Sequence, residues 1–195
     1  MAETPKTDLP VVLFKDQKAW EAWLRKHFAS AAGVWLRVAK KSAQLQSVSY
    51  QEALEVALCY GWIDGQKKSF DEECWLQKFT PRGPKSIWSK INRAKALDLI
   101  EHGQMRPAGL AAIESAKKNG RWDAAYDSHR TAAPPSDFII ALNKDMKAKA
   151  FFATLNSQNR YAILFRIQTA KKVETRQKRI NQFVEMLAKH EKLYP

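Results

Sequence analysis

The sequence predicts an α+β protein, with a small mixed sheet and packed helices in an N-terminal domain, followed by a small all-α C-terminal domain. Residues 1–130 contain both two-residue and 3.6-residue hydrophobic periods, the patterns of half-buried strands and amphipathic helices. The segment "TAAPPSD" (131–137) has paired prolines, which interrupt regular structure. Only helical periods follow it, so the predicted domains are residues 1–130 and residues 131–195.

The N-terminal domain is expected to begin with a strand, a helix and a second strand. After a tail, "PVVLFKD" (10–16) predicts a short strand, and Asp16 is a suitable N-cap for the next helix. That helix has one amphipathic stripe, formed by Trp20, Trp23, Leu24, His27 and Phe28. In "VWLRVAKK" (34–41), Val34, Leu36 and Val38 alternate with Trp35, Arg37 and Ala39. This alternation predicts a strand with one buried face.

A helix and a hairpin are expected next. Ser49 followed by Glu52 is a capping-box pattern, and the helix that it opens is predicted to stop at Gly61. The runs "WIDGQKKSF" (62–70) and "CWLQKFT" (74–80) are separated by an acidic turn, which predicts an antiparallel hairpin.

Two more helices complete the predicted N-terminal domain. One is expected from about Ser86 to Glu101, with an inner face formed by Ile87, Ile91, Ala94 and Leu97. The other follows Pro107 and ends at Asn119 and Gly120.

The C-terminal domain is predicted to contain four helices, with Ser136, Asp145 and Ser157 as N-caps of the first three. In the last helix the 3.6-residue period predicts that Ile180, Val184 and Leu187 are buried. The same period leaves Lys172, Arg176 and Arg179 in solvent.

The chain has a formal net charge of +13, which creates a positive field. Residues 134–195 contain 12 lysines or arginines against 5 aspartates or glutamates. Such a field attracts an anionic small molecule or nucleic acid as a partner, although a solvated lysine-rich surface would give the same charge.

Several classes of protein are not expected. The start "MAETPKTDLP" has no apolar signal segment and the chain has no long uncharged apolar run, so we expect a cytoplasmic protein without a membrane span. The two cysteines, Cys59 and Cys74, fit no disulfide framework or metal motif. The four histidines lack metal-ligand spacing, and no nucleotide-binding or hydrolase motif is present, so we expect no metal and no cofactor.

The stretch "TPRGPKSIWSKIN" (80–92) is the first candidate site. Free backbone N–H groups at a helix start, with Arg82, Lys85 and Ser86 beside them, would form an anion site. Trp62 and Trp88 are candidate ligand contacts next to it. The alternative is that Ser86 only caps the helix and that Arg82 pairs with an acidic residue, Asp64 or Glu72.

Asp64, between two glycines in "GWIDG", is the one candidate for a catalytic residue. In a cleft it could act as a general base or hydrogen-bond acceptor. The alternative is an Asp-Gly turn, with Trp62 in the core. Because the hairpin returns the chain to its start, we expect the Cα atoms of Asp64 and Arg82 within about 15 Å of each other.

The run "TAKKVETRQKRINQF" (169–183) predicts a basic helix surface formed by Lys171, Lys172, Arg176 and Arg179. It could lie along phosphates, or it could be a solvated helix face.

Five stretches, "VWLRVAKK", "SYQEALEVALCYGWIDG", "FTPRGPKSIWSKIN", "GQMRPAGLAAIESAKKNGRWDAAY" and "AKKVETRQKRI", resemble the YdeI/OmpD-associated family, also described as bacteriocin-protection proteins. The resemblance covers roughly residues 11–190. It implies an α+β domain followed by a helical OmpD-associated domain, and a role in bacterial stress or protection. It implies no reaction.

Two hypotheses follow. The first is a non-catalytic cytoplasmic protein that binds a phosphorylated ligand or nucleic acid through the helix start at Arg82–Ser86. The second is a small cofactor-independent enzyme, in which Asp64 accepts a proton and Arg82 anchors an acidic substrate. An open pocket containing both residues would favour the enzyme, and a closed ion pair would favour the binding protein.

Overall fold

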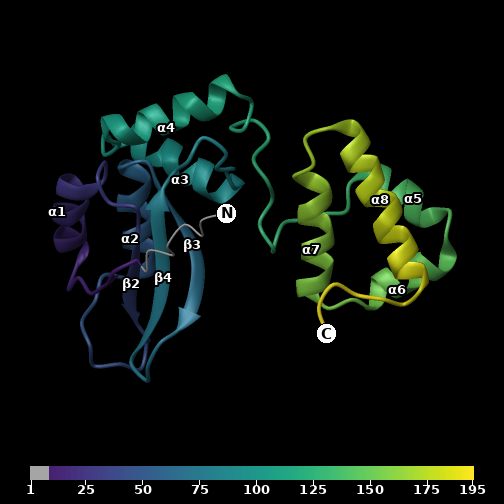
Figure 1. The fold of residues 1–195 in the computed structure, drawn as a ribbon, viewed down its shortest axis with the longest axis horizontal. Helices are drawn as coiled ribbons and strands as arrows, with labels where there is room; N and C mark the ends of the chain where they lie inside the picture. The colour runs from purple at the N-terminus through teal and green to yellow at the C-terminus, as the bar shows by residue number, and fades with distance from the viewer. Residues whose placement is uncertain (1–8) are drawn as a thin grey trace, which may run out of the picture. The chain divides into compact units, whose positions relative to one another are not determined.

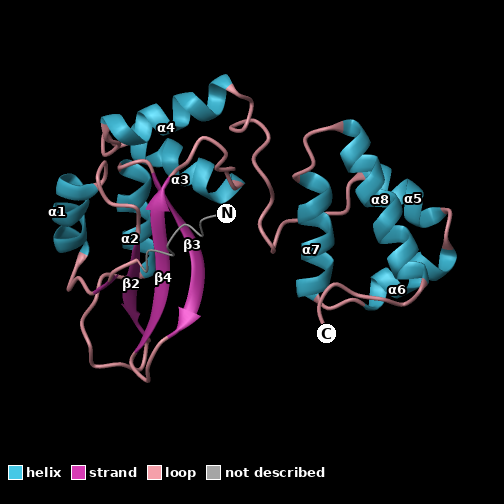
Figure 2. Cartoon of the chain, viewed as in Figure 1, coloured by secondary structure: helices cyan, strands magenta, loops and turns pink. Residues whose placement is uncertain are grey.

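The computed structural model describes residues 9–195, and the predicted tail at residues 1–8 lies outside the described residues. The described residues form two compact units, one from residues 9–87 and 92–123 and one from residues 88–91 and 124–195. Figure 1 and Figure 2 show a sheet with helices in the first unit and helices alone in the second. The α+β class is therefore confirmed, while the domain boundary at residue 130 stays a prediction.

The sheet of the first unit has the strand order β1-β2-β4-β3. Its strands are β1 (Val11–Val12), β2 (Val34–Ala39), β3 (Trp62–Ser69) and β4 (Cys74–Pro81). Strand β1 is parallel to β2, whereas β2 and β3 are both antiparallel to β4. The predicted hairpin is present, and the Asp71 carboxylate accepts hydrogen bonds from the N–H groups of Glu73 and Cys74 at its turn.

Side-chain capping fixes the starts of the first two helices as the sequence predicts. Asp16 caps α1 (Gln17–His27) through the N–H of Ala19. Ser49 and Glu52 form the capping box of α2 (Tyr50–Cys59). Helix α2 ends before Gly61, whose φ of 73° lies in the left-handed region that favours glycine.

One face of the sheet packs against α1 and α2 around a cluster of aromatic rings. Trp20 of α1 is fully buried, lies 5.7 Å from Phe79 and 6.3 Å from Trp62 between ring centroids, and donates from Nε1 to the carbonyl of Ala53 in α2. In β2 every second residue is buried, so Val34, Leu36 and Val38 complete this face. Trp35 and Arg37 point to the opposite face of the sheet.

Helix α3 (Lys90–Glu101) differs from the sequence prediction at its start and in its inner face. It buries Asn92, Ala96 and Leu99. The predicted inner residues Ile91 and Leu97 are each 51% exposed. The apolar residues of this helix are spread around its circumference, so their period did not identify the packed side. Helix α4 (Pro107–Lys118) begins and ends where the sequence predicts.

The second unit contains four helices among the described residues: α5 (Ser136–Asn143), α6 (Met146–Thr154), α7 (Ser157–Gln168) and α8 (Val173–Ala188). Asp145 caps α6 as expected. Ser136 and Ser157 are instead first helical residues, because Pro135 and Asn156 occupy the cap positions. The core includes Ile180 and Leu187 as predicted, and Val184 is half-buried at its edge. No helix within residues 9–195 has the length and apolar character needed to cross a membrane.

Candidate functional site

The carboxylate of Asp64 is held by side chains from two helices. The Tyr50 hydroxyl, at the start of α2, donates to its Oδ2 at 2.8 Å. The Asn92 amide of α3, which is almost fully buried, donates to Oδ1 at 3.4 Å. The capping box of α2 fixes the backbone that orients Tyr50. These two donors fix the orientation of the carboxylate, and they were not foreseen from the sequence.

A β-bulge follows Asp64 in β3. Asp64 is opposite Phe79, but Lys67 is opposite Gln77, so two residues of β3 face one residue of β4. The buried Gln77 amide donates to the carbonyls of Gly65 and Gln66 at 3.0 and 3.3 Å, which satisfies backbone groups that the bulge removes from the ladder. Because of the bulge, Lys67 lies on the same face of the sheet as Asp64, and Lys68 lies on the opposite face.

The structure brings the two candidate stretches together. The N–H of Arg82 donates to the carbonyl of Gly61 at 2.9 Å, directly beyond the last ladder pair, Trp62 and Pro81. Asp64 lies three residues further along β3, a distance of about 10 Å at the usual rise of a strand. The guanidinium of Arg82 donates to the carbonyl of Ile87 at 3.2 Å.

The turn from Arg82 to Ser86 is not a helix start, which corrects the sequence prediction. The Ser86 hydroxyl accepts from the N–H of Gly83, and the Ser86 N–H donates to the Gly83 carbonyl, both at 3.0 Å. Helix α3 begins only at Lys90, because the N–H of Lys90 and the carbonyl of Trp88 bond with the backbone of Tyr126 and hold Trp88 and Ser89 extended. The turn therefore does not present the free N–H groups of a helix end, and Lys85 is simply exposed.

The two candidate tryptophans are buried. Trp62 is 0% exposed, and its Nε1 donates to the Phe28 carbonyl at 3.0 Å. It belongs to the aromatic core, as the alternative interpretation of the sequence expects. Trp88 is 2% exposed and is equally unable to offer a free ring face.

The predicted basic surface on α8 is only partly present. Lys171 and Lys172 are exposed, but Arg176 and Arg179 are half-buried. Arg176 binds the carboxylate of Asp137 at 2.6 and 2.9 Å, and Arg179 donates to the carbonyl of Arg166. Both arginines therefore join helices, and the prediction that they are solvent-facing is wrong.

A cationic and aromatic surface lies on the sheet face opposite the core, and the sequence analysis missed it. We call it the outer sheet face, formed by Trp35, Arg37, Lys68, Phe70 and Lys78. The Nζ atoms of Lys68 and Lys78 lie 4.4 and 5.9 Å from the centre of the Trp35 ring. The Arg37 guanidinium lies 5.2 Å from the centre of the Phe70 ring, and Phe70 is 48% exposed.

The strand register explains why these side chains gather. Trp35 is the ladder partner of Lys78, and Arg37 is the partner of Leu76, which in turn faces Lys68. Residues directly opposite in neighbouring strands share one face of the sheet. The alternation in β2 and the two lysines of "QKKS" contained this information, but only the register shows which strands are neighbours.

A second polar cluster lies where α1, α2 and the start of α4 meet. The Glu21 carboxylate accepts from Arg106 at 2.7 Å and from the Tyr60 hydroxyl at 3.4 Å, beside a pocket of about 380 Å³. Burial raises the pKa of Tyr60, and the hydrogen bond to Glu21 raises the pKa of Arg106. Burial also raises the pKa of the Cys59 thiol, at the same pocket, to about 11.

Within residues 9–195 no group of three or more histidine, cysteine or acidic side chains is placed to hold a metal ion.

Two family models match the chain. Residues 12–112 match a family described as a domain of unknown function (DUF8412). Residues 131–190 match the family described as Bacteriocin-protection, YdeI or OmpD-Associated. No curated protein and no solved structure is detectably similar to the chain.

Proposed function

Because the chain belongs to the YdeI or OmpD-associated bacteriocin-protection family through residues 131–190, we propose that it is a non-catalytic protection protein. Its residues 12–112 belong to a domain family of unknown function. The proposed ligand is single-stranded nucleic acid, and the proposed binding surface is the outer sheet face. The proposed setting is the cytoplasm. The observation on which the proposal rests is the placement of Lys68 and Lys78 around the half-exposed Trp35 ring.

Aromatic rings and cations on a sheet are the combination that binds unpaired bases and their phosphates. Bases stack on exposed rings, and lysines and arginines neutralise the backbone. Within residues 9–195, Lys68 and Lys78 form no ion pair with an acidic side chain, so their charge is available to a ligand. Lysine side chains are flexible, and a base can replace an ammonium group over the Trp35 ring.

The shape of the surface favours an extended anion over a small phosphorylated ligand. Paired side chains from β2, β4 and β3 form a strip across three neighbouring strands, each about 4.8 Å from the next. A small ligand needs a concave site, whereas a single strand can follow a strip. The net charge of +13 supports the same choice through long-range attraction of a polyanion.

Fluorescence anisotropy with a labelled oligothymidylate of about 16 nucleotides tests the proposal, since that length exceeds one such surface. We expect binding at about 50 mM salt that weakens steeply towards about 200 mM. Trp35→Ala should weaken binding about ten-fold, on the scale of one lost stacking contact. Lys68→Gln should weaken binding and reduce its dependence on salt.

Lys192→Gln is the matched charge control, because Lys192 is exposed on the other unit and lies outside the predicted basic surface. It should bind like the parent chain. If the oligonucleotide does not bind at low salt, or if folded Trp35→Ala binds like the parent, the outer sheet face is not a nucleic-acid surface. Loss of binding in Lys85→Gln alone would move the site to the Arg82–Ser86 turn.

A second candidate function rests on Asp64. Its carboxylate is fixed by Tyr50 and Asn92, and an oriented carboxylate next to a phenol can exchange a proton with a substrate. The enzyme hypothesis then predicts that some carboxylate- or phosphate-bearing metabolite is converted by the parent chain and not by Asp64→Asn. An NMR screen of metabolite mixtures with both proteins decides it, and equal spectra for the two would remove this candidate.

A further inference from the structure

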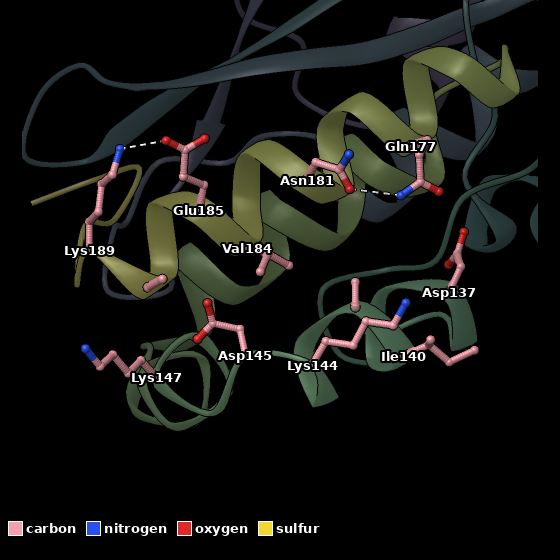
Figure 3. A pocket seen from close by; sticks show the side chains of 12 residues that line it. Asp137, Ile140, Lys144, Asp145, Lys147, Gln177, Asn181, Val184, Glu185 and Lys189 are labelled. Carbon is pink, nitrogen blue, oxygen red and sulfur yellow. Dashed lines mark hydrogen bonds and ion pairs between the residues drawn. The ribbon is translucent and has the colours of Figure 1, made fainter.

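The second unit contains an open groove between α5, the start of α6 and α8. It has a volume of about 800 Å³. Figure 3 shows its side chains, with Val184 on α8, Ile140 on α5 and Lys144 directly after the end of α5. The groove lies entirely within the helical unit and shares no residue with the outer sheet face.

The floor of the groove is apolar and partly uncovered. Ile140 is 58% exposed, and the other apolar lining residues, Ala141, Val184 and Ala188, are half-buried. The α8 wall extends from Gln177 to Ala188, which is about 16 Å at 1.5 Å per residue. This length matches about three turns of a second helix.

Two of the three carboxylates that line the groove are in ion pairs, so its two unpaired lysines outnumber the one remaining carboxylate, that of Asp145. Asp137 binds Arg176, Asp145 caps α6 through the N–H of Ala148, and Glu185 pairs with Lys189 at 2.7 Å. Figure 3 shows the last of these contacts as a dashed line. Lys144 and Lys147 at the same groove are exposed and form no ion pair with any residue in the described part of the chain.

We propose that this groove is a docking site for an amphipathic helix of a partner protein that has acidic residues beside its apolar face. The apolar side chains of such a helix, spaced i, i+3 or i+4, and i+7, would cover Ile140 and Val184. Its carboxylates would then meet Lys144 and Lys147. This complementarity selects an acidic partner, and the net charge of +13 opposes docking of a second copy of the same chain.

The test uses the full chain and a labelled peptide of about 12 residues, with leucines at the anchor positions and glutamates on both flanks. A scrambled peptide of the same composition and a peptide with lysines in place of the glutamates are the controls. We expect saturable binding of the first peptide only, and NMR chemical-shift changes centred on α5 and α8.

Two matched pairs of variants locate the site. Ile140→Asp should weaken binding about ten-fold or more, the loss typical of one central anchor, whereas Ile139→Asp should not. Ile139 is the adjacent residue of the same helix, is 43% exposed and does not line the groove. Likewise Lys144→Glu should weaken binding, and Lys149→Glu, at an exposed position outside the groove, should not.

The proposal is overturned if no peptide binds, if the scrambled or lysine peptide binds equally well, or if folded Ile140→Asp binds like the parent. Self-association of the parent chain that Ile140→Asp abolishes would identify a second copy as the occupant and would also overturn it. Binding of the groove to anionic lipid vesicles with no binding of the peptide would do the same.

Discussion

The guanidinium of Arg176 holds the carboxylate of Asp137 with two hydrogen bonds, Nε to Oδ2 at 2.6 Å and Nη2 to Oδ1 at 2.9 Å. Its Nη1 also donates to the carbonyl of Ile167 at 3.0 Å. One side chain of α8 therefore binds the first turn of α5 and the last turn of α7.

Arg176→Leu should lower the free energy of unfolding by about 1 kcal/mol. A bidentate ion pair contributes more to stability than a single surface salt bridge, but solvent still screens it. Asp137 is 42% exposed, which limits the effect. Urea unfolding followed by circular dichroism measures it, with Lys172→Leu as the exposed control. Equal losses in the two variants would mean that the pair contributes nothing specific.

The same pair predicts a dependence of stability on pH. The hydrogen bonds from Arg176, together with its charge, hold the pKa of Asp137 below its ordinary value. The folded chain thus binds this proton more weakly than the unfolded chain. The stabilisation is fully present above about pH 4 and is lost as the pH falls through the lowered pKa. The difference in unfolding free energy between parent and Asp137→Asn should shrink over that range, and a constant difference would contradict the assignment.

Removing the hydroxyl that orients Asp64 should destabilise the first unit. Tyr50→Phe deletes the donor at 2.8 Å from the carboxylate, and the expected loss is about 1 kcal/mol, since Asp64 is only half-buried. Tyr194→Phe is the control, because Tyr194 is exposed in the other unit and its hydroxyl accepts only a longer, solvent-exposed bond from Arg166 at 3.3 Å. Thermal unfolding of both variants measures the effect. A Tyr50→Phe chain as stable as the parent would show that the contact is not formed in solution.

Cys59 should react slowly in the folded chain. Burial raises the pKa of its thiol to about 11, so almost none is thiolate at neutral pH, and the thiolate is the reactive form. Iodoacetamide labelling followed by mass spectrometry should modify Cys59 far faster in urea than in buffer. Rapid labelling of the native chain at pH 7 would contradict the buried position.

Gly109 allows α4 to pack closely against the end of α2. A Cβ atom there would lie 2.5 Å from the carbonyl oxygen of Cys59 and 2.7 Å from that of Leu58. Gly109→Ala should therefore destabilise the chain by about 2 kcal/mol, even though alanine is the better helix former.

Gly83→Ala is the matched control, since nothing lies within 4 Å of the position of its Cβ. Chemical denaturation of both variants should show a lower free energy of unfolding only for Gly109→Ala. A stable Gly109→Ala chain would mean that α4 can move away from α2 at little cost.

Much of the local structure follows from short stretches of sequence. The caps at Asp16 and Ser49, the end of α2 at Gly61 and the hairpin turn at Asp71 are all confirmed. Each depends on contacts between residues that are at most a few positions apart, so the sequence contains both partners side by side.

The helix start near Ser86 and the inner face of α3 were predicted incorrectly for the opposite reason. Backbone bonds to Tyr126, 38 residues from Trp88 in sequence, keep residues 88 and 89 extended. Asn92 is buried in place of Ile91 because its amide reaches the carboxylate of Asp64 on a distant strand. The period of apolar residues along one helix cannot reveal either of these contacts, because both involve distant parts of the chain.

The sequence by itself determined the α+β class, the hairpin, and the amphipathic helices of the second unit, because periodicity and capping are properties of neighbouring residues. The predicted hairpin also indicated that "GWIDG" and "TPRGPKS" lie next to each other. Only the tertiary structure decided that Arg176 joins helices, that Tyr50 and Asn92 hold Asp64, and that Trp35 lies among lysines. Those contacts depend on strand register and helix packing, which bring together side chains that are far apart in the chain.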